Sequence, residues 1–429
     1  MKSVSLHTLG CKLNYSETST IGKSFSEKGF TLREYGEPAD IFVLNTCSVT
    51  ENADRECRQI VRSVLRKNPD TYVIVTGCYA QLQPDEIAGI DGVDLVLGIN
   101  EKLHLMDYID NFEKRDLSCI YRESHEKATD FFEAYSADTD SRTRAFLKIQ
   151  DGCNYKCSFC TIPLARGTSR SLSPEKILVN AQKIIDAGYR EIVLTGVNTG
   201  DYSFENYRLI DILKLTDGLD IDRIRLSSIE PNLITDEIIS FAKDSEKFCS
   251  HFHIPLQSGD NEILRSMRRR YNREQYRDTI LKLKENIKDI CIGADVIVGY
   301  PGETDGNFQN TLEFINDLPL NYLHVFSYSE RRNTDAVNLP GKVSIRDRKL
   351  RSGILRRLSD SKRFEFYSGY IGKRLSVLPE SCKDGFTEGL TSNYIRVKFS
   401  GESLTENRLV NVKLTRTDGV KPVFAELPD

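Results

Sequence analysis

Short apolar runs alternate with amphipathic stretches along the first part of the chain. Such alternation is typical of a parallel sheet covered by helices. We therefore expect a Rossmann-like α/β domain over residues 1–118, followed by a polar, poorly periodic linker over 119–140. Within this domain the pattern predicts strands at 4–9, 41–45 and 72–76 and helices at 16–28 and 51–67.

The alternation resumes after the linker. Six successive βα units predict a full or partial βα barrel, which we assign to residues 141–366. Its strands are predicted at 146–149, 191–195, 223–227, 251–254, 293–298 and 323–327, with helices such as 174–187 and 273–286 between them.

The C-terminal part has a different pattern. A helix is predicted over 345–367, with Leu350, Ile354 and Leu358 on one face. Residues 367–429 then carry short strands punctuated by glycine and asparagine and no convincing helix. A small β-barrel is the natural interpretation, so the fold class is α/β with a C-terminal barrel.

Composition restricts the class of protein. A chain of 429 residues with 39% hydrophobic and 28% charged residues is expected to be globular, with two or three domains. No apolar run approaches the roughly 18 residues of a membrane span, and the first residues do not resemble a signal peptide. Eleven cysteines, an odd number, favour metal ligation or catalysis in a reducing compartment over a disulfide framework. The sequence thus favours a cytoplasmic protein with no membrane partner.

Three cysteines, Cys153, Cys157 and Cys160, form a C-x-x-x-C-x-x-C pattern directly after a predicted strand. Three thiolates on one loop can hold three irons of a 4Fe–4S cluster and leave the fourth iron open to a chelating cofactor. A structural zinc site normally has four ligands, and no fourth cysteine or histidine follows at that spacing. Phe159, an aromatic residue beside the third cysteine, is suited to packing against an adenine ring.

This loop, placed on the first strand of a predicted βα barrel, resembles that of the radical S-adenosylmethionine superfamily. The resemblance implies that the open iron chelates the amino and carboxylate groups of S-adenosylmethionine. Cleavage of that cofactor then gives a 5′-deoxyadenosyl radical, so the cofactor performs the difficult chemistry and the protein positions it.

Three further cysteines, Cys11, Cys47 and Cys78, each follow a predicted strand of the N-terminal domain. The carboxyl ends of parallel strands meet at one edge of a sheet, so these thiols are expected to converge. We interpret them as ligands of a second cluster. The alternative, three buried structural thiols, is made less favourable by the repetition at three strand ends.

The two cysteine sets together resemble the methylthiotransferase family over almost the whole chain. The motifs GCKLN, LARGTSRS, HIPLQSGD, MRRRY, FSYSERRNT and TSNYIRV are most similar to the branch that modifies N6-threonylcarbamoyladenosine beside the tRNA anticodon. Asn333 departs from that pattern, because glycine is expected there.

The resemblance implies an enzyme with two 4Fe–4S clusters and S-adenosylmethionine. One cofactor molecule would methylate a sulfide on the auxiliary cluster, and a second would give the radical that activates carbon-2 of the adenine. The implied partners are the tRNA anticodon stem-loop and an electron donor such as flavodoxin or ferredoxin. The resemblance also implies a TRAM-type RNA-binding barrel at 367–429.

Several residues after the predicted barrel strands, most of them polar, are candidates to bind the cofactor. Each of them could instead be an ordinary turn or cap residue. His251 and His253 share a strand face, and a packed barrel interior is favoured over metal binding for them. The cofactor candidates are Gly196, Asn198, Ser228, Glu230, Gln257 and Val298, in addition to Phe159.

The net charge of −4 gives no global nucleic-acid signature, so RNA contacts must be local. Basic residues cluster at 265–277 and at 331–363, although such runs are often only solvated helix faces. With the family resemblance, RNA binding is the better interpretation. The candidates are Arg268, Arg269, Arg331, Arg332, Arg346, Arg348, Tyr394 and Arg396.

Two competing functions stay open at this point. The first is methylthiolation of another substrate, either isopentenyladenosine or an aspartate of a ribosomal protein. The second is a non-catalytic iron–sulfur regulator that binds RNA and needs no cofactor pocket. The polar strand ends argue against the regulator. No acid/base pair is obvious in the sequence.

Overall fold

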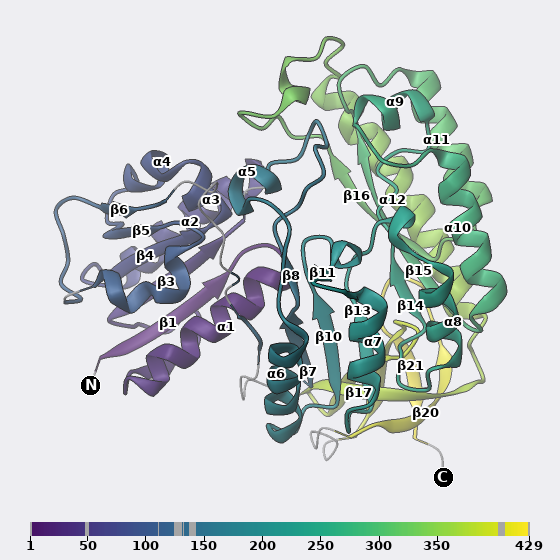
Figure 1. Ribbon diagram of the computed structural model, residues 1–429, viewed down its shortest axis with the longest axis horizontal. Coiled ribbons are helices and arrows are strands. Elements are labelled where there is room, and N and C mark those ends of the chain that lie inside the picture. The colour runs from purple at the N-terminus through teal and green to yellow at the C-terminus, as the bar shows by residue number, and fades with distance from the viewer. Residues whose placement is uncertain are drawn as a thin grey trace. The chain divides into compact units, whose positions relative to one another are not determined.

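The computed structural model describes residues 2–47, 51–109, 111–123, 131, 133–136, 143–401 and 408–427, except for the side chains of 51–53. The chain forms two compact units, which we describe separately (Figure 1). Unit 1 comprises Met1–Asp138, Phe146–Leu172 and Ser329–Thr334. Unit 2 comprises Thr139–Ala145, Ser173–Tyr328 and Asp335–Asp429.

Unit 1 is built on a parallel sheet of six strands in the order β2-β1-β3-β4-β5-β6. This confirms the predicted parallel α/β domain. The sheet extends past residue 118, because the start of the expected linker forms β6 and pairs with β5. The strands are β1 (Ser3–Thr8), β2 (Thr31–Arg33), β3 (Ile41–Thr46), β4 (Tyr72–Gly77), β5 (Leu95–Leu97) and β6 (Cys119–Tyr121).

Helices cover both faces of this sheet, which explains why β3 and β4 are buried along their whole length. On one face Ile21 and Phe25 of α1 pack with Leu105 of η1. On the other face Val61 of α2 and Tyr79 of α3 pack on the opposite side chains of the same strands. These helices are α1 (Lys12–Glu27), α2 (Glu51–Lys67), α3 (Cys78–Leu82), α4 (Pro84–Ala88) and η1 (Glu101–Tyr108).

Unit 1 also contains the loop that carries Cys153, Cys157 and Cys160. The strand β7 (Arg144–Lys148) runs from unit 2 into unit 1. After it, β8 (Gln150–Asp151) pairs with β9 (Arg170–Ser171), and α5 (Ile162–Arg166) lies between them in the chain.

Unit 2 has parallel strands alternating with helices, as the sequence predicts. β10 pairs with β13, and β14, β15 and β16 form a second parallel group. Parallel bridges at Ile224–Phe248 and Ser228–His253 join the two groups into a partial barrel. The strands are β10 (Glu191–Thr195), β13 (Arg223–Leu226), β14 (His251–His253), β15 (Cys291–Val298) and β16 (Tyr322–Ser327), with a small hairpin of β11 (Ser203–Phe204) and β12 (Tyr207–Arg208).

Several helices of unit 2 begin at side-chain caps that the sequence encodes. Asn272 and Gln275 form a reciprocal capping box, and so do Thr304 and Asn307. The helices are α6 (Pro174–Asp186), η3 (Thr199–Asp201), α7 (Leu209–Asp217), η4 (Pro231–Leu233), α8 (Asp236–Asp244), α9 (Asn261–Ser266), α10 (Arg273–Asn286), α11 (Asp305–Asp317), η5 (Asp335–Asn338) and α12 (Ile345–Ser368).

Helix α12 is present as predicted, but its buried face coincides only in part with the predicted one. Leu350 is 60% exposed, whereas Arg351, Leu355 and Ser359 are buried. The buried face includes polar side chains beside Leu355, because Arg351 forms an ion pair with Glu303 and Ser359 exchanges hydrogen bonds with the backbone of β16. Ile354 and Leu358 are half-buried, so of the three predicted positions only Leu350 is exposed to solvent.

The C-terminal strands close into a barrel in the order β17-β18-β19-β21-β20, which confirms the expected architecture. The barrel packs on the amino-terminal part of β13. Arg223 donates hydrogen bonds to the carbonyls of Leu390 and Ser376, and Arg225 donates to those of Thr391 and Ser392. The strands are β17 (Arg374–Lys383), β18 (Phe386–Thr391), β19 (Arg396–Ser400), β20 (Val410–Arg416) and β21 (Val423–Glu426).

Candidate functional site

Cys11, Cys47 and Cys78 lie just beyond the carboxyl ends of β1, β3 and β4, as predicted. Cys47 and Cys78 directly follow their strands, and Cys11 precedes α1. A Cβ atom on Gly10, whose φ is +106°, would lie 2.9 Å from the Sγ of Cys47. Glycine therefore permits the close approach of the first loop to the second cysteine.

The thiol of Cys78, the third of this set, is buried beside charged side chains. Burial raises the pKa of Cys78, and the nearby cations Arg166 and Lys102 oppose that shift. Cys11 is also close enough to act on this pKa. Three gathered thiols beside cationic side chains fit the ligand chemistry of an iron–sulfur cluster.

The other thiol set lies on one loop of unit 1 and consists of Cys153, Cys157 and Cys160. All three are half-buried. The backbone N–H of Tyr155 donates to the Sγ of Cys153 at 3.4 Å, and the N–H of Cys160 donates to the carbonyl of Cys157 at 3.1 Å. A tight loop that directs a backbone N–H to sulfur fits a cluster held by thiolates. Phe159 is half-buried on the same loop.

A polar cavity of about 370 Å³ adjoins this loop in unit 1. Thr161, which follows Cys160, lines it together with Arg122 and Arg332. Asn333 also lines the cavity, and its φ is +65°. Asparagine is one of the few residues other than glycine that adopt this backbone region, so it preserves the turn for which glycine was expected.

Three buried polar atoms occur at the carboxyl ends of successive strands in unit 2. They are the Oγ1 of Thr195, the Oγ of Ser227 and the Oε1 of Gln257, and none has a hydrogen-bond partner among the described residues. Gln257 also has a strained backbone, with φ at +66°. Unsatisfied buried atoms and backbone strain are typical of ligand sites, so these strand ends fit a polar cofactor. Sequence reasoning singled out Gln257 but missed Thr195 and Ser227.

The other cofactor candidates also lie at strand ends. Gly196 and Asn198 follow β10, and the backbone carbonyl of Ser228 accepts a hydrogen bond from Thr199. Val298 ends β15 and is fully buried. Glu230 differs from these, because its carboxylate is paired with the guanidinium of Arg269.

Four of the RNA candidates are exposed: Arg268, Arg332, Arg346 and Arg396. Arg332 keeps 78% of its side chain exposed while it pairs with Glu86. Exposed guanidinium groups of this kind remain available to phosphate.

The other RNA candidates are wholly or partly buried within their units. The side chain of Arg269 is 3% exposed, and that of Arg331 is 6% exposed and pairs with Asp54 at 2.7 Å. Arg348 donates to the carbonyl of Tyr328 at 2.9 Å, and Tyr394 stacks on a buried histidine. A guanidinium needs several acceptors, and here the protein interior supplies them.

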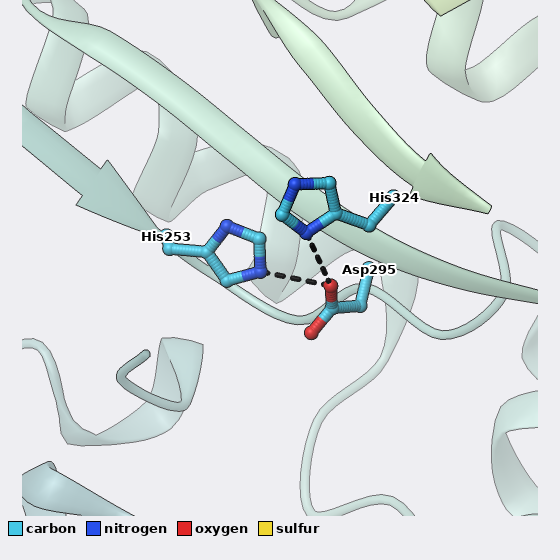
Figure 2. Close-up of side chains that lie close together, drawn as sticks. All are labelled: His253, Asp295 and His324. Carbon is cyan, nitrogen blue, oxygen red and sulfur yellow. Dashed lines mark hydrogen bonds and ion pairs between the residues drawn. The ribbon is translucent and has the colours of Figure 1, made fainter. Parts of the chain in front are cut away.

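His253, Asp295 and His324 form a cluster on β14, β15 and β16 (Figure 2). The Nε2 of His253 and the Nδ1 of His324 lie 2.9 and 3.3 Å from the Oδ1 of Asp295. The three ligand atoms lie within 4.8 Å of one another, so the set could hold a divalent metal or bind polar groups of a substrate. The sequence did not reveal this cluster, because only the strand register brings Asp295 beside His324.

Comparisons with known proteins match most of the chain. Residues 147–315 match the model described as the radical SAM superfamily, and residues 3–98 match uncharacterized protein family UPF0004. The threonylcarbamoyladenosine tRNA methylthiotransferase MtaB of Bacillus subtilis is 41% identical, over 97% of this chain and 94% of the relative. The protein of the same name from Thermotoga maritima is 33% identical, over 100% of this chain and 98% of the relative.

The chain belongs to the radical S-adenosylmethionine methylthiotransferase family. The resemblance inferred from the motifs is thereby confirmed. A relative with another substrate in its name, tRNA-2-methylthio-N(6)-dimethylallyladenosine synthase of Clostridium botulinum, is 30% identical over 96% of this chain and 94% of the relative.

Solved structures agree on the fold. The radical S-adenosylmethionine methyltransferase TsrM from Kitasatospora setae, with cobalamin and a [4Fe-4S] cluster bound, matches with a TM-score of 0.55 at 13% identity. That match covers 79% of this chain and 77% of the other. In the described part of the chain, no helix is both long and apolar enough to cross a membrane.

Proposed function

We propose that this chain is a tRNA methylthiotransferase that adds a methylthio group to carbon-2 of N6-threonylcarbamoyladenosine next to the anticodon. The observation that carries the proposal is the pair of three-cysteine sets, one at three parallel strand ends and one on a single loop. Similarity along nearly the whole chain to relatives named for this reaction supports the choice of substrate.

In this proposal the two cysteine sets have different roles. Cys153, Cys157 and Cys160 hold the cluster that binds S-adenosylmethionine, and Cys11, Cys47 and Cys78 hold the auxiliary cluster. When bound, these groups supply the 5′-deoxyadenosyl radical, the methyl group and the sulfur.

The residues at the strand ends orient the cofactor. The unsatisfied oxygens of Thr195, Ser227 and Gln257 bind its polar groups, together with Gly196, Asn198, Ser228 and the backbone at Val298. Phe159 packs against the adenine ring. Glu230 acts through its ion pair with Arg269, which holds the loop after β13 in place.

The exposed arginines Arg268, Arg332, Arg346 and Arg396 contact the phosphates of the anticodon stem-loop. The target base leaves its stack before reaction, because carbon-2 is inaccessible while stacked. A tRNA substrate and clusters that need a reductant imply a cytoplasmic location and an electron donor such as flavodoxin or ferredoxin.

Mass spectrometry of tRNA nucleosides tests the proposal directly. A strain that lacks the protein should accumulate N6-threonylcarbamoyladenosine without its methylthio form, and the wild-type chain should restore it. The variant with Cys11, Cys47 and Cys78 replaced by alanine should cleave S-adenosylmethionine but not restore the product. Cys57→Ala is the matched control, because this thiol is a core residue of α2 outside both sets. Loss of the methylthio form of isopentenyladenosine instead would assign the other substrate.

A further inference from the structure

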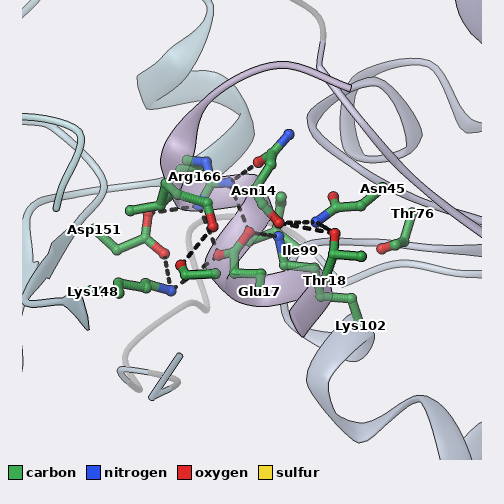
Figure 3. A network of polar contacts seen from close by, with 12 residues as sticks. Asn14, Glu17, Thr18, Asn45, Thr76, Ile99, Lys102, Lys148, Asp151 and Arg166 are labelled. Atoms are coloured by element: carbon green, nitrogen blue, oxygen red, sulfur yellow. Dashed lines mark hydrogen bonds and ion pairs between the residues drawn. The ribbon is translucent and has the colours of Figure 1, made fainter. Parts of the chain in front are cut away.

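Arg166 is a buried arginine that contacts the elements leading to both cysteine sets. It ends α5, six residues after Cys160, and its side chain is 1% exposed. Its Nη1 donates to the Oδ1 of Asp151 at 2.9 Å and its Nη2 to the Oδ1 of Asn14 at 2.6 Å. Both nitrogens also bind the carboxylate of Glu17, at 3.1 and 3.0 Å (Figure 3).

Each of these partners is tied to a cysteine loop. The Nδ2 of Asn14 donates to the carbonyl of Leu9, before Cys11, and to that of Thr46, before Cys47, each at 3.0 Å. Asp151 lies two residues before Cys153. The residue before the arginine, Ala165, packs in one hydrophobic cluster with Cys78. One guanidinium thus connects the loops of both thiol sets.

The network around this arginine is richer in cations than in anions. Lys102 pairs with Glu17, and Lys148 lies 3.1 Å from Glu17 and 2.7 Å from Asp151. Arg170 approaches Asp151 at 3.7 Å. Four cations therefore face two carboxylates, which leaves two positive charges in excess. Burial would raise the pKa of Glu17, but the three cations around it hold that pKa well below its usual range, so the carboxylate stays ionised.

We infer that Arg166 is a positioning residue that connects the two cysteine loops, and that its network keeps excess positive charge beside the auxiliary thiols. This inference rests on the proposed function of Cys11, Cys47 and Cys78. Positive charge in a buried site stabilises the more negative, reduced form of a cluster. The network therefore holds the reduction potential of the auxiliary site higher than it would be without these cations.

Potentiometric titration followed by electron paramagnetic resonance tests this inference. The full-length chain with Cys153, Cys157 and Cys160 replaced by alanine serves as background, so that the signal comes from the auxiliary site alone. Lys102→Met and Arg166→Gln should each shift the midpoint to a more negative value while about four irons per chain are retained. Arg166→Lys keeps the charge and should stay near the background value.

Lys114→Met is the matched control. Lys114 binds the carbonyls of Thr71 and Gly92, at the amino-terminal edge of the same sheet, so its loss should leave the midpoint unchanged. If Arg166→Gln does not fold, the midpoint potentials of Lys102→Met and Arg166→Lys still test the inference. An unmoved midpoint in Lys102→Met with iron retained overturns the inference alone. A background protein that binds no iron overturns the proposed auxiliary site and, with it, this inference.

Discussion

The ring of Tyr394 in the C-terminal barrel stacks on the imidazole of His251 at the start of β14, with centroids 4.0 Å apart and planes 15° apart. The guanidinium of Arg225 lies 5.3 Å from the centre of the same tyrosine ring. Aromatic and cation–π contacts of this kind, in a partly buried site, contribute to stability. The barrel therefore packs as part of unit 2.

Deleting residues 368–429 should consequently destabilise unit 2. Arg223 and Arg225 would lose four carbonyl acceptors, and each buried donor left without a partner costs about 1–3 kcal/mol. Chemical denaturation should show a large loss of unfolding free energy or no cooperative transition. A truncated chain as stable as the full-length chain would contradict this structural role of the barrel.

Glu191 should make the unfolding free energy of unit 2 depend on pH in the acid range. Burial would raise its pKa, but the paired guanidinium of Arg225 lowers it to about 2 from an ordinary 4.5. Because the pKa of Glu191 is lower in the folded state, its ionisation stabilises the fold at pH values above its pKa in the unfolded chain. This contribution to the unfolding free energy, about 3 kcal/mol, is lost as pH falls from 4.5 to 2.

Glu191→Gln should lower the unfolding free energy at neutral pH by about 3–5 kcal/mol, because it leaves buried cations unpaired. Urea unfolding over a pH series should also show a flatter acid limb for this variant. An unchanged slope between pH 4.5 and 2 would exclude Glu191 as its source.

Anaerobic reconstitution should load about eight irons per chain, since each three-cysteine set holds a 4Fe–4S cluster. Replacing Cys153, Cys157 and Cys160 by alanine should remove half the iron and abolish cleavage of S-adenosylmethionine. The control Cys57→Ala should keep all the iron, because burial raises the pKa of that core thiol to about 12. A triple variant that keeps about eight irons per chain would contradict the assignment of these cysteines as cluster ligands.

Replacing Arg332, Arg346 and Arg396 by alanine should weaken tRNA binding and reduce its salt dependence. Each lost phosphate contact lowers the slope of log affinity against log salt by about one. Filter binding at several salt concentrations measures this slope. Lys288→Ala removes another exposed cation and should change little. If the wild type and both variants give the same slope of log affinity against log salt, these arginines form only a solvated face.

Asn333 should tolerate glycine but not a β-branched residue. Its φ of +65° is accessible to asparagine and glycine, so Asn333→Gly should be nearly neutral. Asn333→Val should cost roughly 1–2 kcal/mol of unfolding free energy, measured by denaturation. Asn338→Val, at an exposed position without positive φ, is the control and should cost less.

The sequence by itself determined the alternation of strands and helices in both α/β parts, the C-terminal barrel and the location of both cysteine sets. The strands before Cys47 and Cys78 are local apolar runs, and a local pattern also marks the loop of Cys153, Cys157 and Cys160. Such features depend on residues that are neighbours in the chain, and parallel connections then bring the strand ends to one edge.

Only the tertiary structure decided how individual charges are used. Arg331 reads as a surface cation in the sequence, yet its partner Asp54 lies 277 residues away in the chain. Arg166 binds Asn14 across 152 residues, and Asp295 meets His253 across 42. Whether a charged side chain is exposed or buried depends on the acceptors that distant segments place around it. That information is absent from local periodicity and arises only when those segments pack together.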